Sequence, residues 1–185
     1  MVKRLRRFSA EEYHRLAQAG VLQEDEPVEL IRGEILEMSP IGSRHAAVVN
    51  RLARFFIRAL EDEALVSVQN PLRLGPDSEP QPDLALLRPK EDDYATRLPQ
   101  EQDVLLLLEV AEASLAYDLE VKLPLYASHG IPEVWVVDLG QGRVWVFRNP
   151  KGRAYRESLT AGPADTLSPL LLPNVALPLE KILLP

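Results

Sequence analysis

The stretch Val104-Leu-Leu-Leu-Leu-Glu-Val110 decides the fold. It is apolar at nearly every position over the length of one strand, which is typical of a central strand that is covered on both faces. Two more apolar runs of strand length come before it, at residues 66–74 and 82–88, and Pro and Gly residues break up these runs. The sequence therefore predicts a sheet whose central strand carries an acid, Glu109, near its end.

Helices are predicted on both sides of this group of strands. Residues 44–60 have helical periodicity, and a second helix is expected from about residue 118 to residue 129, where Gly130 ends it. The apolar side of the first helix is formed by Val48, Leu52, Phe55, Phe56 and Ala59. Strands at residues 134–138 and 144–147 follow. The order of helix, three strands, helix and strand indicates an α/β (α+β) fold around a central mixed sheet.

The two ends of the chain add further elements. Ser9 and Glu12 form a capping box, which predicts a helix over residues 10–19, and residues 28–31 and 34–38 flank Arg32-Gly33 as a β-hairpin. The Leu- and Pro-rich tail, residues 162–185, is expected to lie extended over the domain or over a neighbouring subunit. We expect a single domain over residues 1–185. We also expect the apolar tail to be exposed, which favours a homo-oligomer, a dimer or higher.

Composition excludes several classes of protein. The chain has no cysteine, so any metal must be held by oxygen or imidazole ligands. The longest aliphatic run is far shorter than the roughly 20 residues of a membrane span, and the basic start is followed by polar residues, so we expect a cytoplasmic protein. The motifs of P-loop enzymes, serine hydrolases and zincins are missing. Because the net charge is −7, binding of nucleic acid would need a local basic patch or bound cations.

Two acids stand where neighbouring strands would bring them together. Asp83 opens one apolar strand and Glu109 lies near the end of the next, so antiparallel pairing would place both carboxylates at one edge of the sheet. Such a pair suits a hard divalent ion such as Mg²⁺, although each acid could instead end its strand in water. Lys122 follows Asp118 by four residues, on the same face of the predicted helix. It either forms a solvated ion pair with Asp118 or is directed at the two carboxylates.

Other polar residues allow two interpretations each. His45 falls within the apolar arc of the first helix. It is either a hydrogen-bonded core residue or a metal ligand. Glu29 is a half-exposed strand residue or a third metal acid. Between residues 38 and 60 the chain carries arginines and no acid, which indicates either phosphate contact or a solvated face. These arginines are Arg44, Arg51, Arg54 and Arg58.

Pro82-Asp83, Glu109-Val110 and Lys122 together resemble the PD-(D/E)XK nuclease superfamily, whose core order is αβββαβ. Residues 28–34, 79–83 and 126–138 look like segments of a large bacterial family classed as restriction endonucleases of this fold, and the resemblance covers residues 9–180. One departure is that Ala111 stands where the superfamily pattern has its lysine. Lys122 would replace that lysine from the helix. The first core helix also lacks the acid that many members carry. Either Glu29 or His45 takes the place of this acid, or no residue does.

The resemblance implies a Mg²⁺- or Mn²⁺-dependent endonuclease that hydrolyses DNA. Asp83, Glu109 and the carbonyl of Val110 would bind the ion, and Lys122 would position the attacking water or stabilise the pentavalent phosphorus. Glu29, His45 and Asp118 would be accessory residues, and the four arginines would bind nucleic acid. Two alternatives stay open: a catalytically inactive binding or assembly protein of the same fold, and a metallohydrolase acting on a small phosphorylated molecule.

Overall fold

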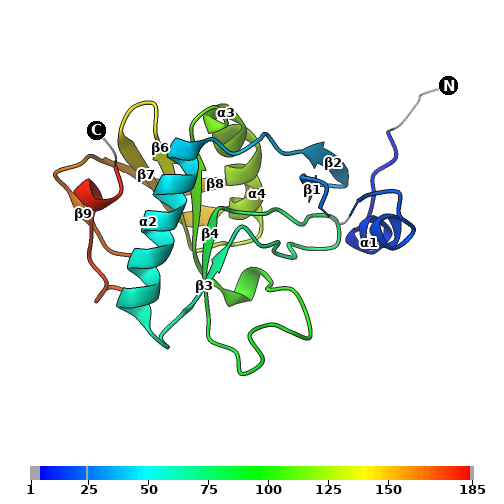
Figure 1. The fold of residues 1–185 in the computed structure, drawn as a ribbon, viewed down its shortest axis with the longest axis horizontal. Helices are drawn as coiled ribbons and strands as arrows, with labels where there is room; N and C mark the ends of the chain where they lie inside the picture. The colour runs from blue at the N-terminus through cyan, green and yellow to red at the C-terminus, as the bar shows by residue number, and fades with distance from the viewer. Residues whose placement is uncertain (1–4, 24, 184–185) are drawn as a thin grey trace.

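The computed structural model describes residues 5–23 and 25–183 and is built on a six-stranded mixed sheet (Figure 1). The strand order is β3-β4-β5-β6-β7-β8, and only β5 and β6 pair in parallel. The strands are β3 (Leu65–Val68), β4 (Leu84–Leu87), β5 (Val104–Ala111), β6 (Glu133–Asp138), β7 (Arg143–Lys151) and β8 (Ala154–Ala161). The predicted fold class, with its αβββαβ core, is confirmed.

The central strand β5 is covered on both faces, as its apolar sequence predicts. All eight of its residues are buried. Helix α2 (Ser43–Leu60) packs on one face, where Leu52 and Phe56 meet Leu106 and Leu108. The other face is covered by the helical segment that follows β5, and Leu125 lies there against the core. Figure 1 shows α2 in front of the sheet with that second helical segment behind it.

Helix α2 agrees with its prediction, with its buried stripe turned slightly. Val48, Leu52 and Phe56 are buried as expected, whereas Ala59 is exposed and Phe55 is half-buried. Val49 and Leu60 are buried in addition. No helix within residues 5–23 and 25–183 combines the length and the apolar character needed to span a membrane.

The helix after β5 begins at residue 115, three residues earlier than predicted, and contains a wide turn. It consists of α3 (Leu115–Tyr117), a π-helical turn η2 (Asp118–Lys122) and α4 (Leu123–Ser128). The Leu123 N–H bonds to the carbonyl of Asp118, five residues back. A proline has no N–H and its ring crowds the preceding turn, so the wide turn just before Pro124 accommodates it without ending the helix.

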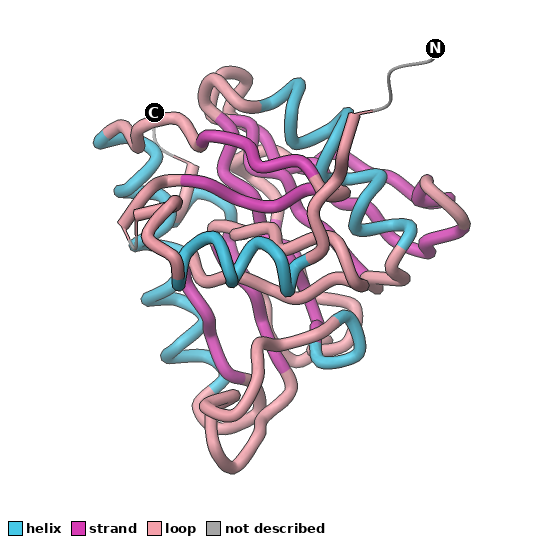
Figure 2. The backbone as a smooth tube through the Cα atoms, turned by 90° about the vertical axis from the view of Figure 1, so that its right-hand side faces the viewer, coloured by secondary structure: helices cyan, strands magenta, loops and turns pink. Residues whose placement is uncertain are grey.

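Helix α1 (Ala10–Gln18) and the hairpin of β1 (Val28–Ile31) and β2 (Glu34–Glu37) form as predicted. Both hydrogen bonds of the capping box are present. Arg32 and Gly33 have φ angles of 50° and 79°, so the hairpin turn is left-handed at both positions. Figure 1 shows α1 and the hairpin beside the large sheet, and Figure 2, seen from that side, shows them in front of it.

The hairpin is joined to the segment that leads into β4. The N–H of Glu79 donates to the carbonyl of Leu30 at 2.6 Å, and the return bond measures 3.4 Å. All four residues of β1 are buried, including Glu29 at 2 % exposure. This docking brings Glu29 beside the start of β4, where Asp83 lies.

Two strand predictions differ from the structure. The predicted strand over residues 66–74 ends at Val68, because Gln69 has a φ angle of 52° and leaves the extended conformation. Leu72 and Leu74 lie outside the sheet and join the second core. Strand β8 is not predicted at all. It is an edge strand whose residues are mostly exposed, so its sequence lacks the apolar alternation by which strands are recognised.

The tail lies over its own domain. Short strands β9 (Thr166–Leu167) and β10 (Leu177–Pro178) pair with each other, and the single turn η3 (Leu179–Lys181) follows. Apart from the exposed Leu170 and Leu171, its large apolar residues up to Leu183 are buried, several of them in the core beneath α2. The expectation of an exposed apolar tail is therefore wrong, and a homo-oligomer stays a prediction without that support. The last two residues lie outside the described part of the chain.

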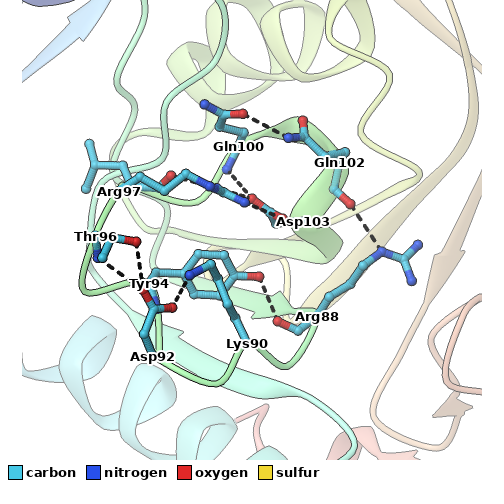
Figure 3. Close-up of polar contacts among 10 residues, drawn as sticks. Arg88, Lys90, Asp92, Tyr94, Thr96, Arg97, Gln100, Gln102 and Asp103 are labelled. Atoms are coloured by element: carbon cyan, nitrogen blue, oxygen red, sulfur yellow. Dashed lines mark hydrogen bonds and ion pairs between the residues drawn. The ribbon is translucent and has the colours of Figure 1, made fainter.

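The long connection between β4 and β5 is held by two aspartates (Figure 3). Asp92 pairs with Lys90 and accepts hydrogen bonds from Thr96. Asp103 accepts two bonds from the Arg97 guanidinium, at 2.6 and 3.1 Å, and a third from the Gln100 N–H. The connection closes the β4–β5 hairpin at the end away from Asp83, and so helps to fix the strand register.

Candidate functional site

The structure brings Asp83 and Glu109 together through the register of β4 and β5. Leu84 pairs with Leu108, so the next two residues, Asp83 and Glu109, lie opposite each other. The N–H of Val110 donates to Asp83 Oδ2 at 2.8 Å, and Gln69 Nε2 donates to Asp83 Oδ1 at 3.1 Å. The aspartate is therefore held against the end of β5.

Lys122 points at Glu109 and Glu29 from the π-helical turn. Its Nζ lies 3.2 Å from Glu109 Oε1 and 3.4 Å from Glu29 Oε2, and its side chain is only 7 % exposed. The interpretation of Lys122 as a solvated ion pair with Asp118 is wrong, because both residues are buried. Lys122 reaches Glu109 from the helix, while Ala111 occupies the strand position of the superfamily lysine.

The remaining predicted accessory residues surround this group. His45 Nε2 lies 3.0 Å from Asp83 Oδ2, and its other ring nitrogen is buried without a hydrogen-bond partner among the described residues. Asp118 is 4 % exposed and accepts a hydrogen bond from Ser114 Oγ at 2.7 Å. Glu29 accepts a bond from the N–H of Gln81 and pairs with Lys122.

Two tyrosines belong to the site and are not predicted as site residues from the sequence. The Tyr126 hydroxyl donates to Glu109 Oε1 at 2.5 Å, and the Tyr117 hydroxyl donates to Glu29 Oε1 at 3.0 Å. A signal exists for Tyr126, which follows Lys122 by four residues and so shares its helix face. Tyr117 offers no such signal, because a tyrosine in a helix usually contributes to the core.

The site holds more acidic than basic side chains, and burial shifts the pKa values of two of the acids. Burial raises the pKa of Glu109 to about 8; Lys122 opposes the shift, while Asp118 and Asp83 add to it. Burial also raises the pKa of Asp118 to about 6, with Lys122 again opposing. Glu29, Asp83, Glu109 and Asp118 thus share one cluster with a single lysine, so the cluster favours an additional cation.

The pKa values of the two basic groups, Lys122 and His45, are both raised. Burial alone lowers the pKa of Lys122, but the charges of Glu109, Glu29 and Asp118 outweigh it and leave the pKa raised. The hydrogen bond to Asp83 raises the pKa of His45 more than burial lowers it. An ammonium group therefore stands among the carboxylates, where it can contact an anion.

The possible metal ligands are few. Within residues 5–23 and 25–183, no three His, Asp or Glu side chains are arranged to hold a metal ion together. Asp83 and Glu109 supply two carboxylates, and the carbonyl of Val110 faces the same edge as its N–H. Pro82, the residue opposite that carbonyl, has no N–H to donate. Glu29 is engaged by Lys122 and Tyr117, which does not support its interpretation as a third metal acid. The other interpretation, a half-exposed strand residue, is wrong, because Glu29 is buried.

The four arginines lie along α2 and lead away from the acids. Arg44 is in the first turn of the helix, one residue before His45, and Arg58 is in the last turn. All four are exposed, and none forms an ion pair with any other residue in the described part of the chain. Their role in binding nucleic acid stays a prediction.

Comparison with known proteins identifies the family. The family model described as "Uma2: Putative restriction endonuclease" matches residues 10–180. The crystal structure of a putative nuclease belonging to DUF820, from Anabaena variabilis ATCC 29413, is similar with a TM-score of 0.74 and 18 % identity. That match covers 91 % of this chain and 96 % of the other, and at this identity it shows the fold alone. Among curated proteins, none matches this sequence. The chain therefore belongs to the Uma2 family, in agreement with its resemblance to PD-(D/E)XK nucleases.

Proposed function

We propose that this protein is a metal-dependent endonuclease that hydrolyses phosphodiester bonds in DNA. The observation that carries the proposal is the convergence of Asp83, Glu109 and Lys122, which come from three separate segments of the chain. An ammonium group beside two facing carboxylates is what metal-assisted phosphodiester hydrolysis needs. Membership of a family described as restriction endonucleases supports the same reaction.

The donors at the site suit Mg²⁺ or Mn²⁺. Two carboxylates and a backbone carbonyl are hard oxygen ligands, and Mg²⁺ keeps several waters in its coordination shell, so it does not require a third acidic side chain. Burial raises the pKa values of Glu109 and Asp118, and a bound cation would favour their ionised forms. In our proposal, Asp83, Glu109 and the Val110 carbonyl hold the ion.

The residues have distinct roles in the proposed reaction. The bound ion would lower the pKa of a water molecule and offset charge on the scissile phosphate. Lys122 would stabilise the negative charge that develops on the phosphate oxygens. Glu29 and Tyr117 would position Lys122, and Tyr126 and His45 would orient Glu109 and Asp83 through their hydrogen bonds.

The test is the pair of variants Asp83→Asn and Asp93→Asn. Both make the same chemical change, but Asp93 is exposed in the β4–β5 connection, away from the site. We expect Asp83→Asn to abolish the saturable heat of Mn²⁺ binding and to lower the rate of DNA cleavage by at least about a hundredfold. An unchanged melting temperature would show that the fold is intact. Asp93→Asn should keep both metal binding and cleavage. Cleavage at the normal rate by Asp83→Asn would rule out the assignment.

One observation favours the alternative, a binding or assembly protein that has lost cleavage. Lys122 is almost fully buried and is already paired with two carboxylates, which limits its access to a substrate. Titration with Mn²⁺ separates the two functions. Saturable Mn²⁺ binding together with cleavage supports the endonuclease, whereas DNA binding with neither supports the alternative.

The proposed substrate also bears on assembly. A single site cuts one strand at a time, so two copies of the chain would allow both strands of a duplex to be cut. We therefore retain a homo-oligomer as part of the proposal. Sedimentation velocity with and without duplex DNA measures it directly.

A further inference from the structure

A groove between α2 and the tail gathers positive charge on a protein whose net charge is −7. Its volume is about 520 Å³. Its lining consists of three arginines and a lysine around a small apolar floor: Arg51, Arg54, Arg58 and Lys181 with Phe55 and Ala59. None of the described residues that line it is acidic. The groove is separate from the Asp83 cluster and has no part in the proposed chemistry.

The two walls of the groove are tied together. The guanidinium of Arg51 donates to the carbonyl of Lys181 at 3.3 Å, which joins α2 to η3. Arg54 and Arg58 are exposed and have no ion-pair partner among the described residues. Their charges are therefore available to a ligand, whereas Arg51 also has a structural contact.

The two ends of α2 differ in the charge that lies beyond the groove. Glu61, Asp62 and Glu63 follow α2 directly and line a neighbouring pocket that shares Ala59 with the groove, so negative charge beyond this end of the helix would repel a polyanion. At the other end, Arg44 stands next to His45, which contacts Asp83. From Arg58 to Arg44 the helix rises by about 21 Å. A chain of phosphates lying along the arginines would thus run from the groove toward the acids.

We propose that this groove binds the phosphate backbone of a single strand of nucleic acid on its way to the Asp83 cluster. Arg54, Arg58 and Lys181 would contact phosphates, and Phe55 with Ala59 would form the floor beneath a sugar or base. The apolar floor favours a single strand, because a duplex keeps its bases stacked inside and offers them no face. The inference rests on the proposed function in taking nucleic acid as the ligand.

The test measures binding of a fluorescent 20-nucleotide oligo(dT) in EDTA, where no cleavage occurs. The double variant Arg54→Ala/Arg58→Ala should raise the Kd about tenfold and reduce the slope of log Kd against log salt by about 1.4. The control Lys151→Ala/Arg156→Ala removes the same charge from exposed positions on β7 and β8 and should change the Kd less than twofold. Equal effects of the two double variants would overturn the proposal.

A second variant tests the apolar floor. Phe55→Leu keeps an apolar side chain against the core but removes the aromatic face, and should raise the Kd for oligo(dT) about fivefold. Unlabelled single strand should compete better than a duplex of equal length or inorganic tripolyphosphate. An unchanged Kd for Phe55→Leu, or equal competition by tripolyphosphate at equal charge, would reduce the groove to a general anion surface and refute single-strand binding.

The two proposals can fail separately. If Asp83→Asn cleaves DNA normally while the arginine variant binds weakly, the catalytic assignment is wrong and the groove stands. If Asp83→Asn loses cleavage while the arginine variant binds normally, the groove proposal alone is refuted.

Discussion

Glu109 is a residue at which burial and charge act against each other. Its carboxyl group is buried on the central strand, and two hydrogen-bond donors, Lys122 and Tyr126, contact the same oxygen. Burial nevertheless dominates and raises its pKa to about 8. At neutral pH, folding without a metal ion therefore keeps a proton on a group that is ionised in the unfolded chain.

This shift sets the sign of a pH dependence. Between pH 4.5 and about 8, the folded protein binds a proton at Glu109 that the unfolded chain has lost, so the free energy of unfolding should fall as pH rises. The contribution of one such group is at most about 1.4 kcal/mol per pH unit. Urea unfolding in EDTA at pH 5, 6.5 and 8 measures it. Glu109→Gln, which cannot titrate, should show a clearly flatter dependence; a slope equal to that of the wild type would contradict the raised pKa.

At this scale, the sequence predicts part of the site. The meeting of Asp83 and Glu109 follows from two neighbouring antiparallel strands, and residue spacing alone suffices to expect it. The direction of Lys122 depends on the family resemblance, because i,i+4 spacing to Asp118 equally describes a surface ion pair. Tyr117 could not be predicted, because its role depends on where its hydroxyl group lies and not on its apolar ring. For Tyr126 the only signal is its spacing of four residues from Lys122, which does not reveal the contact of its hydroxyl group with Glu109.

Among the elements, the β4–β5 connection is the part whose stability depends most directly on ion pairs. The guanidinium of Arg97 lowers the pKa of Asp103, against the effect of burial, and the bond from the Gln100 N–H lowers it further. Asp103 is thus ionised and engaged by three donors at neutral pH (Figure 3).

Asp103→Asn should therefore lower the free energy of unfolding by about 1 kcal/mol at pH 7, a value reduced because Arg97 is partly exposed. Because the pKa of Asp103 is lowered in the folded protein, its ionised carboxylate stabilises the fold above pH 3.8. This stabilisation is lost as the pH falls through the pKa of Asp103 in the folded protein. The difference in free energy of unfolding between the variant and the wild type should therefore vanish in acid. Urea unfolding of both proteins provides the measurement. Asp93→Asn, an exposed neighbour in the same connection, should match the wild type throughout.

The same elements show what pattern reasoning can and cannot reach. Local chemistry fixes the capping box and the Arg32-Gly33 turn, so α1 and the hairpin are predicted nearly to the residue. The wide turn before Pro124 arises from a conflict between the proline ring and the packing of the helix. The spacing of apolar residues in the sequence does not indicate this turn. Strand β8 depends on pairing with β7 and not on burial, so it too is invisible to an apolar pattern.

At the scale of the whole molecule, the C-terminal tail packs over the domain, and one buried acid holds it there. Glu133 is fully buried at the start of β6. Its Oε2 accepts the N–H of Leu170, and its Oε1 accepts bonds from Trp135 and Arg148. Arg148 also donates to the carbonyl of Ser168, so the sheet holds the tail through two neighbouring side chains.

Glu133→Gln should lower the free energy of unfolding by about 3 kcal/mol, because it leaves the Arg148 guanidinium without its buried counter-charge. Thermal and urea unfolding measure the loss, and limited proteolysis should show earlier cutting within residues 162–183. Glu120→Gln, at an exposed helical position, is the matched control and should remain within about 0.5 kcal/mol of the wild type. A tail equally resistant to protease in both variants would show that its leucines suffice to hold it.

The docking of the β1–β2 hairpin has a consequence for how the protein could lose its function. Glu29 reaches Lys122 only because the backbone of Leu30 joins that of Glu79. The large sheet does not include this hairpin. A local opening that released only residues 28–37 would leave the main core folded and yet free the lysine from one of its two partners. The rate of this local opening, and not the melting of the whole protein, would then set how long the assembled cluster survives. Amide exchange in residues 28–37 measures that rate.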